Sequence, residues 1–149
     1  MSFGGPESDL PLPKNANPAI MAVSLAVLRV LEKEGGFVLA NEARYVAGHS
    51  LGEYSALCAA GAITLPDTAK LLKLRGRAMQ QAVPVGVGAM AALLGLNFEQ
   101  AREVASEAAQ GQVCTAANDN ADGQVVVSGH AEAVERAIAI ASAKGAKRA

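Results

Sequence analysis

The first third of the chain places a polar segment before a long apolar one. Residues 1–16 are rich in Gly, Pro and polar side chains and are expected to form a loop or arm. Asn17 followed by Pro18 is typical of an N-cap and a first helical position. The next positions are apolar nearly all round, which predicts a largely buried helix that reaches Glu34 and is ended by two glycines.

A short strand and two helices are expected next. Both faces of residues 43–48 carry apolar side chains, which predicts a strand covered on both sides. A helix follows over about residues 51–60. Thr64 then caps a third helix to about residue 82, with Asp67 completing a weak capping box. A parallel sheet cannot be built from one strand, so this block is expected to be part of a larger α/β domain.

The second half of the chain has a different order of elements. After a linker with one proline and two glycines, the pattern predicts strand, helix, strand, strand and helix, over residues 89–96, 97–110, 113–118, 124–129 and 131–145. This order is that of a split βαβ, or ferredoxin-like, unit without its last strand. We therefore expect two domains, over residues 1–85 and 86–149.

Composition narrows the class of protein. The chain is 51% hydrophobic over 149 residues, which is enough for a packed core, and its net charge is −1 without a basic block. That charge argues against nucleic acid or an anionic membrane as a partner. Cys58 and Cys114 lie far apart in no metal-ligand spacing, which indicates a reduced, cytoplasmic protein without a metal site.

A candidate nucleophile lies at the junction of the expected strand and the helix after it. Gly48-His49-Ser50-Leu51-Gly52 has the G-x-S-x-G form of a nucleophile elbow, in which glycines two before and two after the serine avoid a clash. Ser50 would then lie at a helix N-terminus, and the N–H of Leu51 would form half of an oxyanion hole. The alternative is a glycine-bounded turn in which Ser50 is only an N-cap.

The two histidines are weak candidates for the base of such a serine. His49 is adjacent to Ser50 in the sequence, so its ring should point elsewhere across an elbow, and it is expected to be structural. His130 follows a strand and a turn and is interpreted as a capping or surface residue.

Arg75 occupies a position in the apolar row of its predicted helix, four after Leu71 and four before Met79. A buried guanidinium without a partner is costly. Arg75 could therefore pair with a structural carboxylate such as Glu53, or it could hold an anionic ligand such as an acyl group that carries its own carboxylate.

Essentially the whole chain resembles the bacterial malonyl-CoA:acyl carrier protein transacylases. The resemblance is carried by VAGHSLGEYSALCAAGAITLPDTAKLLKLRGRAMQQAVPVGVGAMAALLGL, with NPAIMAVSLAVLRVLE before it and AANDNADGQVVVSG after it. The GHSLGE elbow followed by the arginine of LRGRAM is specific to these acyltransferases. The implied fold is α/β: part of an α/β-hydrolase-like large domain, plus an inserted ferredoxin-like (split βαβ) small domain.

The resemblance also implies a reaction. Ser50 would take malonyl from malonyl-CoA and pass it to the phosphopantetheine thiol of acyl carrier protein, in fatty acid biosynthesis and without a cofactor. Arg75 would bind the malonyl carboxylate, and the Leu51 N–H would serve the oxyanion. Asn118 and Gln124 would bind substrate from the small-domain side of the cleft.

The sequence departs from the family at both ends. The family's oxyanion glutamine, in a GQGSQ-type loop, and its catalytic histidine are expected outside this chain, so the isolated chain is expected to be inactive or a poor catalyst. The alternatives are an acyltransferase domain of a polyketide synthase and a non-catalytic fragment that lacks the base.

Overall fold

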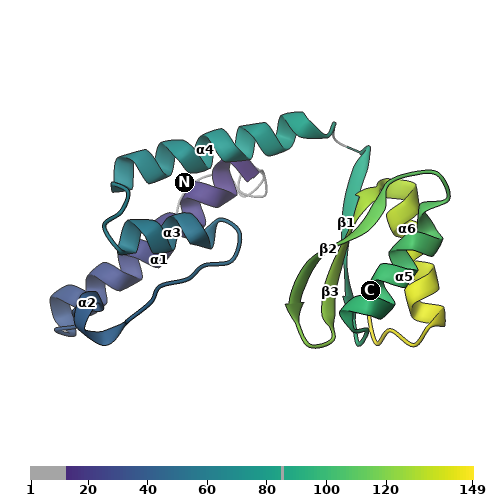
Figure 1. Ribbon diagram of the computed structural model, residues 1–149. Coiled ribbons are helices and arrows are strands. Elements are labelled where there is room, and N and C mark those ends of the chain that lie inside the picture. Colours follow the sequence, from purple (N-terminus) through teal and green to yellow (C-terminus); the bar gives the residue numbers. More distant parts are fainter. Residues whose placement is uncertain (1–12, 85) are drawn as a thin grey trace. The chain divides into compact units, whose positions relative to one another are not determined.

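The computed structural model describes residues 13–84 and 86–149, which fall into two compact units, Met1–Ala82 and Val83–Ala149 (Figure 1). The expected loop over residues 1–16 lies mostly outside the described residues. Each unit has its own packing. No helix in the described ranges is long and apolar enough to cross a membrane.

Unit 1 is helical in the part that the structure describes. Its helices are α1 (Pro13–Glu34), α2 (Leu39–Glu42), α3 (Gly52–Ala59) and α4 (Leu65–Ala82). Helices α1 and α4 pack along each other, and α3 contacts both. The buried stripe of α4 is Thr68, Leu72 and Gly76, at the four-residue spacing of one helix face. Met21 is the buried apolar side chain of α1.

The predicted start of the first helix is wrong. Helix α1 begins at Pro13 and contains Pro18 in its interior. Both prolines fit a first helical position, and only structure decides between them. Asn17 is therefore a helical residue rather than an N-cap, and its side chain is buried instead of exposed at a helix end.

The strand expected over residues 43–48 is also absent from the described part of unit 1. This segment carries no ladder hydrogen bonds, and Tyr45 and Val46 are 80% and 40% exposed. An extended segment becomes a strand only when a neighbour satisfies its N–H and C=O groups. The sequence pattern detected the apolar faces, but no partner strand lies beside them in these residues. Helix α2, which the pattern missed, precedes this segment.

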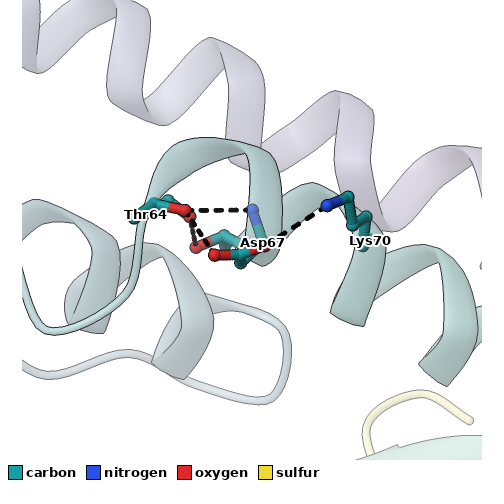
Figure 2. Close-up of polar contacts among 4 residues, drawn as sticks. Thr64, Asp67 and Lys70 are labelled. Atoms are coloured by element: carbon teal, nitrogen blue, oxygen red, sulfur yellow. Dashed lines mark hydrogen bonds and ion pairs between the residues drawn. The ribbon is translucent and has the colours of Figure 1, made fainter.

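Helix α4 starts at the predicted cap. Thr64 Oγ1 accepts a hydrogen bond from the Asp67 N–H (3.3 Å) and donates one to Asp67 Oδ2 (2.7 Å), as Figure 2 shows. In a standard capping box the acidic side chain would accept from the backbone N–H of the cap residue. Here it accepts from the hydroxyl instead. This hydrogen bond, followed by Lys70 at 3.4 Å, lowers the pKa of Asp67.

Unit 2 is a three-stranded antiparallel sheet covered by two helices on one side (Figure 1). Its elements are β1 (Gly88–Leu94), α5 (Phe98–Ala109), β2 (Cys114–Ala121), β3 (Gln124–His130) and α6 (Ala131–Ala143), in the order expected from the sequence. The strands lie in the order β1-β3-β2. Asn97 caps α5 with a complete capping box. The core includes the fully buried Leu93, Val125 and Val127.

The end of the chain contacts the free edge of β1. The Leu94 N–H donates to the Arg148 carbonyl (2.8 Å), and the Lys147 N–H donates to the Leu94 carbonyl (2.7 Å). The two segments run antiparallel at this bridge. Residues 147–148 therefore begin the pairing that an additional strand on this edge would continue.

The Thr64 cap can be tested by substitution. We expect Thr64→Ala to lower the free energy of unfolding of unit 1 by about 0.5–2 kcal/mol, because the Asp67 N–H loses its acceptor. Urea unfolding at pH 7 measures this loss, with Lys70→Ala as the control, since an exposed ion pair contributes little.

The same cap predicts a dependence on pH. Because the folded pKa of Asp67 is lowered, its contribution is present above the pKa of the unfolded chain and is lost as the pH falls through the folded value. Part of the difference between wild type and Thr64→Ala should therefore disappear in acid. A difference that is the same at pH 7 and well below the usual carboxyl range would contradict a role for the carboxylate.

Candidate active site

The candidate nucleophile lies on a strained turn. Ser50 has φ +55°, which is uncommon for a residue other than glycine. The turn is held by hydrogen bonds from the N–H groups of Gly52 and Glu53 to the carbonyls of His49 and Ser50 (2.9 and 3.2 Å). The Ser50 hydroxyl is exposed at the start of α3. This is the geometry that a nucleophile elbow provides.

The two glycines of the motif have different roles. A Cβ on Gly48 would overlap the carbonyl group of Gly52 and contact the Glu53 nitrogen at 2.5 Å. A Cβ on Gly52 would meet nothing within 4 Å in the described residues. The prediction that the turn needs glycine is therefore right for Gly48. At position 52 a Cβ would be accommodated, and only the backbone of this residue is approached by Gly48.

Arg75 reaches the candidate nucleophile. Its Nη2 donates a hydrogen bond of 2.8 Å to Ser50 Oγ, which joins α4 to the elbow across 25 residues of sequence. Among the described residues, no carboxylate lies within ion-pair distance of Arg75, so the suggested pairing with Glu53 is not formed. Arg75 is half-buried, unlike the exposed Lys73 and Arg77 on the same helix. The structure therefore gives Arg75 a partner that neither alternative named, the hydroxyl of Ser50.

The backbone N–H of Leu51 takes no part in the hydrogen bonds that close the turn. The donors that close the turn and start α3 are the N–H groups of Gly52, Glu53 and Tyr54. The N–H of Leu51 is not one of them. It follows the serine directly, as the first oxyanion donor of an elbow does.

An open groove borders the elbow within unit 1. Its apolar lining includes Ile20, Leu25 and Leu28 of α1, together with Val46 and Leu51. Ser50 itself does not line this groove. The apolar side chains of this groove therefore lie beside the elbow, while the Ser50 hydroxyl accepts a hydrogen bond from Arg75.

His130 has a structural role in unit 2. Its side-chain Nδ1 accepts a hydrogen bond of 3.0 Å from the Val113 N–H, and its backbone N–H donates to the Val113 carbonyl (2.8 Å). It occupies the N-cap position of α6 without a side-chain capping bond. The predicted capping position is thus correct, but the side chain bonds the Val113 N–H and does not cap the helix. His49 is an exposed residue of the elbow itself.

Asn118 and Gln124 share one face of the unit 2 sheet. In β3 the residues on both sides of Val126 are fully buried against the helices, so Val126 and Gln124 point to the other face. In β2 the register shifts after Ala116 and places Asn118 opposite Val126. Without this bulge, the period of two would put Asn118 on the core side with Ala116. The bulge has no signal in the sequence, and it brings both predicted amides to the helix-free face.

Comparisons with known proteins show the family of this chain. The family model described as "Acyl transferase domain" matches residues 6–149. This chain belongs to the acyl transferase domain family. The acyl transferase chain is 48% identical over 145 residues to the malonyl CoA-acyl carrier protein transacylase of Escherichia coli (strain K12), covering 97% of this chain and 46% of the relative. The Bacillus subtilis (strain 168) protein of the same name is 45% identical over 148 residues, which are 99% of this chain and 45% of that protein.

Solved structures of similar proteins extend the comparison. The acyl-carrier-protein-S-malonyltransferase from Bartonella henselae matches with a TM-score of 0.91 and 55% identity, over 98% of this chain and 46% of that one. A malonyl-transacylase in complex with a type II polyketide synthase acyl-carrier protein matches with a TM-score of 0.88 and 46% identity, over 97% of this chain and 45% of that one. The acyl transferase chain thus spans about half the length of these relatives.

The unequal glycines of this acyl transferase elbow give a test. We expect Gly48→Ala to destabilise unit 1 by about 1–3 kcal/mol or more, because its Cβ would have to displace backbone atoms. Gly52→Ala should change stability by less than about 1 kcal/mol, since the added methyl meets open space and alanine favours the helix. Urea unfolding compares the two variants. Equal losses would contradict the steric account of the elbow.

Proposed function

We propose that this chain carries the nucleophile and the acyl-recognition side of a malonyltransferase. The reaction moves malonyl from malonyl-CoA to the phosphopantetheine thiol of acyl carrier protein, in fatty acid biosynthesis, by an [acyl-carrier-protein] S-malonyltransferase. The observation that carries this proposal is the 2.8 Å hydrogen bond between Arg75 and Ser50, which places a cation next to the hydroxyl that would be acylated. The relatives' names support the choice of malonyl.

The first half-reaction acylates Ser50. Its Oγ attacks the thioester carbonyl, a C–O bond forms, and negative charge develops on the carbonyl oxygen, where the Leu51 N–H donates. The tetrahedral intermediate collapses with loss of the C–S bond. The proton from Ser50 passes through a base to the coenzyme A thiolate. The thiol of acyl carrier protein reverses these steps, so that Ser50 regains its proton and the carrier takes the malonyl group.

Arg75 would bind the free carboxylate of the malonyl group. That carboxylate is separated from the reacting carbonyl by one methylene, so it must lie close to Ser50 Oγ, where the guanidinium already is. The planar fork of Arg can donate two parallel hydrogen bonds to a carboxylate. In this proposal the base and the second oxyanion donor come from outside these residues.

We also propose substrate contacts for unit 2 and a fold for each of the two domains. Asn118 and Gln124 would hydrogen-bond substrate from the helix-free face of the sheet, supported by their shared face. The order of elements and the bridge between Leu94 and Arg148 support a ferredoxin-like (split βαβ) small domain, over residues 86–149. Residues 1–85 would be part of an α/β-hydrolase-like large domain that acts in the cytoplasm without a cofactor.

A carrier protein of polyketide synthesis is a second candidate acceptor. One similar structure is a malonyl-transacylase in complex with a type II polyketide synthase acyl-carrier protein. The chemistry at Ser50 would be the same, so only the acceptor differs. Transfer from malonyl-Ser50 to each purified carrier protein, measured side by side, distinguishes the two assignments.

The proposed nucleophile can be identified by labelling. Incubation of the chain with radiolabelled malonyl-CoA, in a single-turnover format that detects slow acylation, should place label on the peptide that contains Ser50. Ser50→Ala should abolish it, whereas Ser24→Ala should not, because that hydroxyl donates within its own helix to the Ile20 carbonyl. Label on another side chain, or label that persists in Ser50→Ala, would contradict the proposal.

The proposed carboxylate ligand predicts a change in selectivity. Arg75→Ala should slow acylation by malonyl-CoA about 10- to 150-fold more than acylation by acetyl-CoA, because a hydrogen bond to a charged group contributes roughly 1.5–3 kcal/mol. Rates of Ser50 acylation with the two thioesters measure this ratio. Arg77→Ala is the matched control, since Arg77 is exposed on the same helix. Equal losses with both thioesters would assign Arg75 a structural role.

A further inference from the structure

Among the described residues, the hydrogen-bond partner of the Arg75 side chain before any acyl group is present is the proposed nucleophile. Arg75 Nη2 lies 2.8 Å from Ser50 Oγ. No carboxylate of the described residues is within ion-pair distance of its guanidinium. Because Arg75 is half-buried, this hydrogen bond satisfies a cation that water reaches only in part. The position of the guanidinium therefore depends on the serine hydroxyl.

Acylation removes this partner. When the C–O bond to the acyl carbon forms, the hydroxyl oxygen becomes an ester oxygen, whose lone pair is delocalised into the carbonyl, and it becomes a poor acceptor. A malonyl group supplies a replacement, since its carboxylate lies one methylene from the ester carbonyl and offers two oxygens to the guanidinium. An acetyl group supplies none, so the half-buried cation would lose its acceptor on acylation.

We propose that the Ser50 hydroxyl and the carboxylate of the acyl group compete for the same guanidinium donors of Arg75. This rests on the proposed function and adds how that site selects its substrate. Arg75 keeps a partner through acylation only when the acyl group is carboxylated. Selection then acts at the acylated serine as well as on binding of the thioester, as expected where a missing partner leaves a polar group unpaired.

The competition has a measurable consequence for a free carboxylate ligand. A ligand that must displace the hydroxyl binds only to molecules in which Arg75 is not hydrogen-bonded to Ser50. Its apparent affinity is lower in proportion to the fraction of such molecules. Removing the hydroxyl should therefore tighten binding, although it removes a polar group from the site. A carboxylate that used other donors of Arg75 would not respond in this way.

The experiment is a titration of the chain with malonate alone, followed by isothermal titration calorimetry at constant pH. We expect Ser50→Ala to bind malonate about 3- to 10-fold more tightly than wild type, the range for the loss of one competing hydrogen bond. Ser50→Cys should tighten binding in the same direction, because sulfur is a weak acceptor. Ser24→Ala should match wild type, and Arg75→Ala should abolish binding. Circular dichroism and urea unfolding establish that each variant is folded.

The outcomes separate the competition from the function on which it rests. Equal malonate affinity in wild type, Ser50→Ala and Ser50→Cys, with binding still lost in Arg75→Ala, overturns the competition and leaves Arg75 as a carboxylate ligand. Weaker binding in both Ser50 variants also overturns it, because the hydroxyl would then assist the ligand. Malonate binding that survives Arg75→Ala, or that is absent from every form, overturns the proposed role of Arg75 itself.

Discussion

The close approach of Gly48 to Gly52 is the constraint on which the site depends. It is possible only because Gly48 lacks a Cβ, which would otherwise overlap the Gly52 carbonyl. The approach folds the chain back tightly enough to hold Ser50 at φ +55° and to start α3 directly after it. The strained backbone of the candidate nucleophile is thus possible because the residue two positions earlier has no Cβ. The exposed hydroxyl and the backbone donor of Leu51 both follow from this turn.

The second half of the site is held by a different element. Arg75 lies on α4, whose start is fixed by the Thr64 cap and whose buried stripe packs on the rest of unit 1. Gly76, the next residue, is buried in that stripe. Arg75 then spans from α4 to the elbow and bonds Ser50 Oγ. Two local features, a tight turn and a helix cap, therefore determine where a nucleophile and a cation meet.

Local chemistry explains which predictions from the sequence were correct. Three predictions depend on a few adjacent residues, and each was correct: the cap at Thr64, the need for glycine at position 48 and the order of elements in unit 2. The start of α1 was missed because two prolines fit the same role. The bulge before Asn118 was missed because it depends on how β2 aligns with β3, which no local pattern encodes.

Arg75 shows how far a sequence pattern can be taken at a site. Its place in an apolar row indicated that it needed a partner, and both a carboxylate of the chain and an anionic ligand met that requirement. The structure replaced both with a third partner, the hydroxyl of the candidate nucleophile. A hydroxyl can satisfy a guanidinium and can then be consumed by the reaction, which a structural carboxylate cannot. In the function proposed above, the partner of Arg75 would take part in the chemistry, and the need of a buried cation for a partner would become a basis for substrate selection.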